Sequence, residues 1–348
     1  MIKILLSPFV FIYNGIITIR NSFFDNSIFK SERVNAKVIS VGNITVGGSG
    51  KTPLVIYVVK LLKNSGYHVG VLSRGYRRKS KGYKLVSKGK EVLTSVEECG
   101  DEIIQTVMEC SVAAAVSENR VKGANRLIKE ANVNAIVLDD AFQHRWIARD
   151  IDLVVIDQSF FNQRSALTHN LFPLGDLRES FDALNRADAI ILNRKFFAKE
   201  ELNQELVKFI NDRNLFTAYY KAISFVDVMR KIEYSLEEFK GQDSLVVSGI
   251  ANPKSFLNIL EQVHVNTRNK MIFGDHKNYT LKEVQKIRKQ FYTTNSHSVV
   301  TTEKDAVKLS RFNRELDDVD IFYLKINLCM DDEESFKQYI INKLNNAS

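Results

Sequence analysis

The first apolar pattern lies at the N-terminus, where residues 4–19 carry no charge between Lys3 and Arg20. As a helix these 16 residues would be about 24 Å long, whereas a membrane-spanning helix needs roughly 20 apolar residues. The polar side chains fall on one narrow stripe at helical spacing, namely Ser7, Asn14, Thr18, Asn21 and Asp25. The wide apolar remainder predicts a helix that lies in a membrane interface. A helix packed on the protein's own core is the alternative; no small-residue cleavage site follows to mark a signal peptide.

After Lys37 the pattern changes to short apolar runs that end in polar residues. These runs, which predict buried strands, are residues 38–41, 69–72, 135–138, 153–156 and 189–192. Between the first two, apolar residues recur at helical spacing over residues 54–62, and Gly66 follows as a helix-terminating glycine. Strands that alternate with helices predict a parallel sheet, in which ligands bind at the carboxyl ends of the strands.

From about residue 225 charged and apolar segments alternate more closely. Further strands are predicted at residues 244–248 and 298–301, with helices near 254–262 and 281–291. We therefore predict an N-terminal interfacial helix segment (1–35), an α/β core with a parallel sheet (36–224), and a smaller C-terminal α/β lobe (225–348).

Charge adds one feature to this picture. The chain has 348 residues and a net charge of +8, and a run without acids between Ser73 and Lys90 matches that surplus. Its members are Arg74, Arg77, Arg78, Lys79, Lys81, Lys84, Lys88 and Lys90. The run suggests an anionic partner (a phosphorylated substrate, an anionic lipid surface or nucleic acid), and a solvated basic loop is the alternative. The three cysteines lack metal or disulfide spacing, which is typical of reduced thiols.

The strongest chemical motif is the loop between the first strand and its helix. It reads Gly47-Gly48-Ser49-Gly50-Lys51-Thr52, with Thr45 where a phosphate loop usually begins with glycine. Glycines let backbone N–H groups face phosphates, the lysine places a charge on the β- and γ-phosphates, and the threonine hydroxyl can hold Mg²⁺. We predict that residues 45 and 47–52 bind a nucleoside triphosphate. The guanine-selecting Asn-Lys-x-Asp pattern is absent, because Glu303-Lys304-Asp305 has the wrong spacing, and this favours ATP.

Two acidic pairs are candidates for metal binding and catalysis. Asp139 and Asp140 end a buried strand, where an aspartate that binds Mg²⁺ is expected; helix-capping acids are the alternative. Asp101 and Glu102 open a helical pattern, and a carboxylate there could accept the proton of an acceptor hydroxyl. First-turn acids that only stabilise the helix are the alternative.

Several stretches together resemble one family, the tetraacyldisaccharide 4'-kinases, which act on lipid A precursors. They are the segment 41–53, Leu72-Ser73-Arg74-Gly75-Tyr76, Gly100-Asp101-Glu102, the segment 138–144, the segment 174–179, the segment 249–253, Gly274-Asp275-His276 and the segment 302–306. The resemblance runs to about Lys308. It implies a phosphate-loop core with a smaller C-terminal lobe, and transfer of the γ-phosphate of ATP to the 4'-hydroxyl of a disaccharide that carries a 1-phosphate.

The resemblance also implies roles for individual residues. Asp101 matches the catalytic base and His276 the histidine that pairs with it. Glu102, Asp139 and Asp140 match the acids around Mg²⁺, which Thr52 also holds. The substrate residues are expected to be Arg74, Arg77, Gln143 and His144. The family usually has glycine where this chain has Ala141, and proline where it has Asp176.

The sequence thus predicts a kinase that uses ATP and Mg²⁺ on a lipid A precursor, tetraacyldisaccharide 1-phosphate. We expect it to be peripheral or monotopic at the cytoplasmic face of the inner membrane, without nucleic acid or an obligate protein partner. Two rival hypotheses stay open at this point: a soluble phosphate-loop kinase of a small metabolite, and a membrane-associated nucleotide switch.

Overall fold

Each apolar run that was predicted to be a strand forms one in the computed structural model. The structure describes residues 2–162, 170–202, 204–210, 214–250, 252–275 and 277–346. The chain divides into two compact units, Met1–Tyr219 with Cys329–Ser348, and Tyr220–Leu328. The predicted second lobe ran to residue 348, but the last segment of the chain belongs to the first unit because its helix packs there, with Phe336 against Tyr57 and Phe216.

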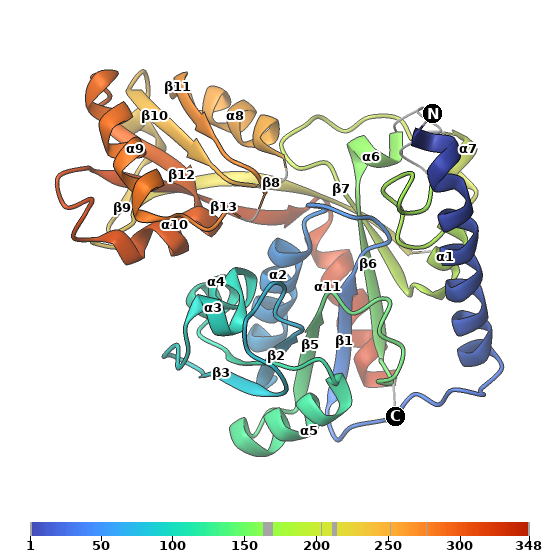
Figure 1. Cartoon of the computed structure of the whole chain (residues 1–348). Helices are drawn as coiled ribbons and strands as arrows, with labels where there is room; N and C mark the ends of the chain where they lie inside the picture. Colours follow the sequence, from blue (N-terminus) through green and yellow to red (C-terminus); the bar gives the residue numbers. More distant parts are fainter. Residues whose placement is uncertain are drawn as a thin grey trace. The chain divides into compact units, whose positions relative to one another are not determined.

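The first unit is built on a mainly parallel sheet (Figure 1). Its strands are β1 (Lys37–Gly42), β2 (Val69–Ser73), β3 (Lys84–Lys88), β4 (Ala113–Val116), β5 (Ala135–Asp139), β6 (Ile151–Asp157), β7 (Ala189–Asn193) and the first part of β8 (Asn214–Asp227). Their order is β8-β7-β6-β1-β5-β2-β4-β3, and β3 is antiparallel to β4. Val41 pairs with Asp139 on one side of β1, and Gly42 with Val154 on the other. The loop after β1 therefore emerges between the ends of β5 and β6.

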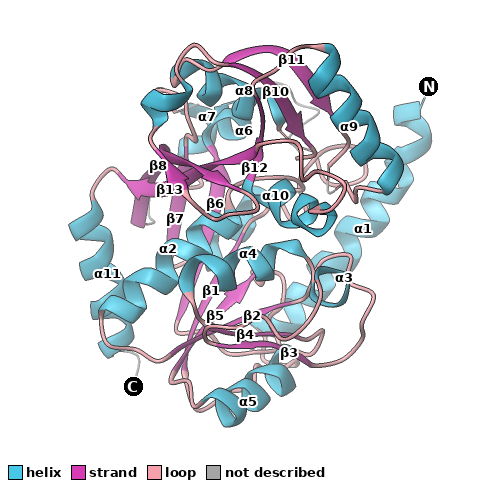
Figure 2. Ribbon diagram, turned by 90° about the vertical axis from the view of Figure 1, so that its left-hand side faces the viewer, coloured by secondary structure: helices cyan, strands magenta, loops and turns pink. Residues whose placement is uncertain are grey.

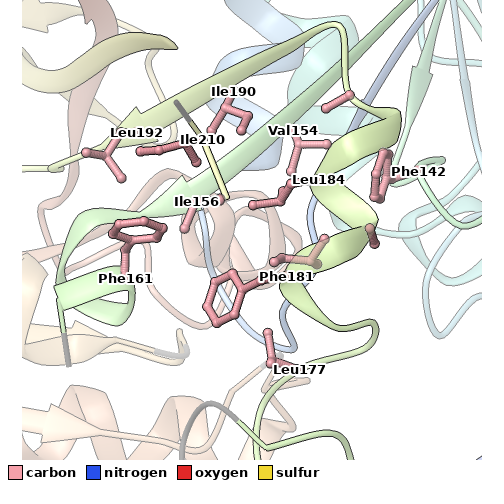
Figure 3. Packing of buried hydrophobic residues seen from close by; sticks show 13 residues of the cluster. Phe142, Val154, Ile156, Phe161, Leu177, Phe181, Leu184, Ile190, Leu192 and Ile210 are labelled. Carbon is pink, nitrogen blue, oxygen red and sulfur yellow. The ribbon is translucent and has the colours of Figure 1, made fainter. Parts of the chain in front are cut away.

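Helices of the first unit lie around this sheet, and several of them pack on it through apolar side chains. They are α1 (Ile2–Asp25), α2 (Lys51–Asn64), α3 (Val96–Cys99), α4 (Asp101–Cys110), α5 (Arg120–Ala131), α6 (Gln158–Asn162), α7 (Gln204–Val207), α11 (Glu333–Asn346) and the 3₁₀ helix η1 (Phe181–Arg186). Gly66 follows the last turn of α2 with a φ of +86°, as the sequence predicted. Figure 3 shows the cluster in which Leu184 of η1 packs against Val154 and Ile190 of the sheet.

Helix α1 is amphipathic, but its apolar side faces outward. It contacts the rest of the first unit through the buried ring of Phe24 and through polar contacts, which include hydrogen bonds from Tyr13 Oη to the Arg178 carbonyl and from Asn21 Nδ2 to Glu179. Large apolar side chains on its other side are exposed, namely Phe9, Phe11, Ile12, Ile16, Ile19 and Phe23. Among the described residues no helix is long and apolar enough to cross a membrane.

The second unit is a smaller α/β sandwich. Its strands, in spatial order, are β11 (Asn266–Ile272), β10 (Asp243–Ser248), β12 (Ser298–Thr302), β13 (Ile321–Met330) and the second part of β8, with β9 (Glu233–Tyr234) beside β8. Figure 2 shows its helices, which are α8 (Pro253–Gln262), α9 (Leu281–Thr293) and α10 (Glu303–Leu309). The 3₁₀ turns η2 (Leu236–Phe239) and η3 (Ser310–Phe312) complete it. Val284 and Ile287 of α9 pack with Val247 on one face of this sheet.

The end of β1 approaches the segment after β5 so closely that only glycine fits. A Cβ atom on Gly42 would lie 2.6 Å from Cβ and 2.7 Å from the backbone nitrogen of Phe142, both inside van der Waals contact. Phe142 itself is fully buried, so it cannot move aside cheaply. This contact fixes the point from which the glycine-rich loop starts.

We expect Gly42→Ala to lower the stability of the protein by about 1–3 kcal/mol, because the new methyl group overpacks a rigid core. Gly15→Ala is the matched control, since a Cβ atom at Gly15 meets nothing within 4 Å and alanine favours the helix. Thermal unfolding monitored by circular dichroism would measure both. A melting temperature of Gly42→Ala equal to that of the wild type would contradict the close contact.

Candidate active site at the ends of β1 and β5

The glycine-rich loop connects β1 to α2 and turns on two glycines. Gly47 and Gly50 have φ angles of +103° and +102°, in the left-handed region that side chains other than glycine rarely adopt. Gly47 and Gly48 are exposed, whereas Ser49 and Thr52 are buried beneath them. The predicted strand–loop–helix arrangement is therefore present, and the start of α2 adds its partial positive charge to the loop amides.

Three amide side chains hold this loop from below. Asn43 donates to Thr45 Oγ1 at 3.2 Å and to Ser49 Oγ at 2.8 Å. Gln143 donates to the carbonyl oxygen of Asn43 at 2.9 Å, and Asn193, at the end of β7, donates to that of Ser49 at 3.2 Å. Gln143, which the sequence assigned to the substrate, thus holds the loop backbone. Asn193 was missed, because its partner lies far away in the sequence.

A second segment supports the loop through its backbone. The N–H of Val46 donates to the carbonyl of Asp176 at 2.6 Å, and that of Arg178 donates to the carbonyl of Ile44 at 2.7 Å. Because these bonds use main-chain atoms, the aspartate that stands at position 176 in place of the family's proline makes its contact without its side chain.

The neighbouring acids Asp139 and Asp140 lie in opposite environments. Asp139 is buried, accepts from Ser73 Oγ at 3.2 Å, and has a second carboxylate oxygen without a hydrogen-bond partner in the described part of the chain. Burial, with the charge of Glu102, raises the pKa of Asp139 to about 7. Burial also opposes ionisation of Asp140, but the charges of Lys51 and Arg178 outweigh it and lower the pKa of this carboxyl.

Geometry accounts for the charge on Asp140. Its carboxylate lies 3.7 Å from Lys51 Nζ, and Nη1 of Arg178 reaches both of its oxygens at 2.9 and 3.0 Å. The backbone of Asp140 adopts a φ of +49°, which turns the chain sharply after β5. Lys51, the lysine of the glycine-rich loop, is thus joined to the acids at the end of the next strand.

Arg120 is a buried cation that the sequence did not reveal. Only 2% of it is exposed, and its guanidinium donates to the carbonyl oxygens of Ser117 and Asp139, the latter at 3.3 Å. Burial lowers the pKa of Arg120 to about 10, so the side chain stays charged at neutral pH. At the first position of α5 an arginine looks like an ordinary helix residue, and only the fold puts its charge beneath the acids.

Asp101 and Glu102 form the first turn of α4, beside the turn that follows β2. A Cβ atom on Gly75 would lie 2.8 Å from the carbonyl oxygen of Cys99, so the two backbones are in close contact there. Asp101 is 6% exposed, and the charge of Glu102 acts on Asp139. The structure therefore places Glu102 close enough for its charge to act on Asp139.

His144 is half-buried among arginines. Burial lowers its pKa to about 4, and the charges of Arg120, Arg149 and Arg74 act in the same direction. His144 is consequently a neutral imidazole at physiological pH. Arg74 itself is exposed, as is Arg77, whose guanidinium lies over the neighbouring Tyr76 ring at 5.2 Å.

Part of the basic run serves the fold. Arg78 pairs with Glu118 at 2.5 Å, and Lys84 pairs with Glu98. Lys84 and Lys88 lie on β3, the edge strand, where lysines discourage pairing with another chain. The exposed remainder is Arg74, Arg77, Lys79, Lys81, Lys88 and Lys90.

His276 lies outside the described residues. In the part of the chain that the structure describes, no group of three or more His, Cys, Asp or Glu side chains could hold a metal ion.

Comparison with known proteins identifies the family of this chain. A family model described as Tetraacyldisaccharide-1-P 4'-kinase matches residues 2–345. The tetraacyldisaccharide 4'-kinase of Halothermothrix orenii is 36% identical over 318 residues, which are 86% of this chain and 81% of that protein. The enzyme of the same name from Aquifex aeolicus is 30% identical over 341 residues, 98% of either chain.

A solved structure extends the similarity to the fold. The crystal structure of LpxK from Aquifex aeolicus in complex with ATP superposes with a TM-score of 0.79 at 29% identity, covering 99% of this chain and 100% of that one. The match spans both the phosphate-loop core and the smaller unit. This chain therefore belongs to the tetraacyldisaccharide-1-phosphate 4'-kinase family.

Proposed function

We propose that this chain transfers the γ-phosphate of ATP to the 4'-hydroxyl of a tetraacyldisaccharide 1-phosphate at the ends of β1 and β5. The observation that carries the proposal is the junction of the glycine-rich loop with the acids, through the contact between Lys51 and Asp140. A phosphate-binding loop, a lysine and carboxylates in one place are what phosphoryl transfer requires. The related Aquifex aeolicus structure is a complex with ATP.

The triphosphate binds along the loop. The backbone amides of residues 47–52 and the Nζ of Lys51 face its oxygens, and the side chains of Asn43 and Asn193 keep the loop in shape before it binds. Arg178 and Lys51 both contact Asp140, and these contacts hold the two cationic side chains close to the loop that binds the phosphates. This preorganised positive field stabilises the charge on the group in transfer.

The acids fit a magnesium ion. Asp139 carries a buried oxygen without a partner among the described residues, and Thr52 presents a buried hydroxyl in the first turn of α2. Mg²⁺ prefers oxygen ligands and usually keeps several waters, so it needs few protein ligands besides the phosphates. When bound, the ion neutralises charge on the phosphate oxygens. Asp140 and Glu102 complete the acidic surroundings.

Asp101 accepts the proton of the 4'-hydroxyl as that oxygen attacks the γ-phosphate. It is buried at the start of α4, next to Glu102, whose charge reaches Asp139. A carboxylate in this position can orient the hydroxyl and take its proton.

Substrate recognition follows from charge. Arg74 and Arg77 are exposed on the turn after β2 and would meet the 1-phosphate, since arginine suits phosphate oxygens. His144 lies near Arg74 and, being neutral, can both donate to and accept from sugar hydroxyls. Gln143 contributes to the site by donating a hydrogen bond to the Asn43 carbonyl, which holds the loop in place.

Helix α1 brings the enzyme to the membrane that contains its substrate. Phe11, Ile12 and Ile16 are exposed by 77%, 60% and 63%, an apolar surface that water disfavours and lipid accepts. The hydrogen bonds of Tyr13 and Asn21 keep this surface turned away from the rest of the first unit. We infer a peripheral or monotopic enzyme at the cytoplasmic face, where ATP is available.

We expect Asp101→Asn to lower kcat by about 10²–10⁴-fold with little change in the KM for ATP, because the amide cannot accept the proton. Transfer of radiolabelled γ-phosphate from ATP to a tetraacyldisaccharide 1-phosphate measures this. Asp182→Asn, an exposed first-turn acid of η1, is the matched control and should retain wild-type activity. Undiminished transfer by Asp101→Asn would show that Asp101 is not the base.

We expect the double substitution Ile12→Asp with Ile16→Asp to weaken binding to phospholipid vesicles at least tenfold, because each exposed isoleucine would bury apolar surface in the lipid. Asn14→Asp with Thr18→Asp adds the same charge on exposed polar positions of α1 and is the matched control. Vesicle cosedimentation measures both. Equal loss in the two variants would mean that charge, not the apolar face, governs the association.

A further inference from the structure

The turn after β7 is fastened to the glycine-rich loop, and the proposed mechanism uses none of its side chains on a substrate. Asn193 is fully buried; its Nδ2 donates to the Ser49 carbonyl at 3.2 Å, and its Oδ1 accepts from the N–H of Lys195 at 2.9 Å. One side chain thus ties the 193–197 turn to the loop that binds phosphate.

The strand order shows which part of a nucleotide this turn can meet. Relative to β1, the acids of β5 and Arg74, which follows β2, all lie on one side, in the order β7-β6-β1-β5-β2. The γ-phosphate must lie on that side, next to the reacting groups. A nucleoside triphosphate extends well beyond its γ-phosphate, so its ribose and base point the other way, past the ends of β6 and β7. Ligands of open parallel sheets occupy this crevice at the carboxyl ends of the strands.

Arg194 is the residue of the turn best suited to a flat ring. Its guanidinium lies 4.5 Å from the centre of the Tyr219 ring, its Nη2 pairs with Asp331 at 2.9 Å, and its Nη1 donates to the Phe197 carbonyl at 3.0 Å. These contacts hold a planar cation in one orientation, yet 21% of the side chain stays exposed. Guanidinium planes stack on aromatic rings, including nucleobases.

The neighbours of Arg194 limit what the turn can recognise. Lys195 is buried and paired with Asp157, so its charge is compensated. The turn reads Asn193-Arg194-Lys195-Phe196, with a phenylalanine where the guanine-selecting pattern has aspartate. No carboxylate at that position can accept from the N–H groups of guanine. Asp305, in the motif with the wrong spacing, is fully buried and bonded to Gly249 and Thr302 in the second unit.

We propose that the base of the nucleoside triphosphate stacks on the guanidinium of Arg194 in the 193–197 turn, which makes Arg194 a determinant of nucleotide affinity. This inference rests on the proposed function, since it takes the glycine-rich loop as the site of the triphosphate. It assigns Arg194 to binding of the base and not to the phosphates or the transfer step.

The test compares ATP with inorganic tripolyphosphate, which has the phosphates but no base. We expect Arg194→Ala to raise the KM for ATP about tenfold, to leave kcat within about twofold, and to leave the inhibition constant of tripolyphosphate unchanged. Arg194→Lys keeps the charge next to Asp331 but loses the plane, so it should raise the KM for ATP as well. Arg126→Ala is the matched control, because Arg126 also lies over a tyrosine, Tyr83, at 4.0 Å and pairs with Glu130.

Three results would overturn the proposal: an unchanged KM for ATP in Arg194→Ala, an equal weakening of ATP and tripolyphosphate, or full recovery of ATP affinity in Arg194→Lys. The first result would mean that Arg194 does not contact the base. The second would mean that Arg194 acts on the phosphate-binding loop, and the third that only its charge, paired with Asp331, matters. Lys51→Ala separates this failure from that of the proposed function. If Lys51→Ala binds both ligands as the wild type does, the loop is not the nucleotide site.

Discussion

The site depends on charge that is buried at the ends of β1 and β5. Asp139 is buried and Asp140 is partly buried, and carboxylates withdrawn from water in this way must be paired or lose their ionisation. The protein uses both outcomes in adjacent residues. Lys51 and Arg178 keep Asp140 ionised, whereas Asp139 retains an oxygen without a partner among the described residues and a raised pKa. One strand end thus carries an ionised carboxylate paired with two cations and, beside it, a buried carboxyl oxygen without a partner among the described residues.

The backbone around these charges is held by contacts that tolerate little change. Gly42 lies against Phe142, Gly75 lies against the Cys99 carbonyl at the end of α3, and the loop itself is bonded to Asn43 and Asn193. Because interactions between charges depend steeply on distance in a buried site, small shifts of the loop would disturb the pairing of Lys51 with Asp140. The electrostatics of the site therefore depend on the packing of the sheet, because the close backbone contacts hold the charged side chains in place.

Helix α1 reverses the usual pattern of an amphipathic helix. Tyr13 and Asn21 bind it to the rest of the first unit through hydrogen bonds, while most of its large apolar side chains, such as Phe11, Ile12 and Ile16, are exposed. In water this arrangement costs free energy, since the apolar side gains nothing from exposure. A lipid surface removes that cost, and a glycolipid acceptor lies in such a surface. The exposed apolar side of the helix and a glycolipid acceptor thus both favour a lipid surface.

The sequence by itself determined the strands, the main helices, the glycine-rich loop and the family, because these depend on the periodicity of neighbouring residues and on contiguous motifs. Only the tertiary structure decided that Arg120 lies beneath Asp139, that Gln143 and Asn193 hold the loop, and that Asp139 and Asp140 have opposite pKa shifts. It also showed that the last helix belongs to the first unit and not to the C-terminal lobe. The burial of a residue and the charges around it depend on segments that are far apart in the chain. A local sequence pattern therefore cannot predict them.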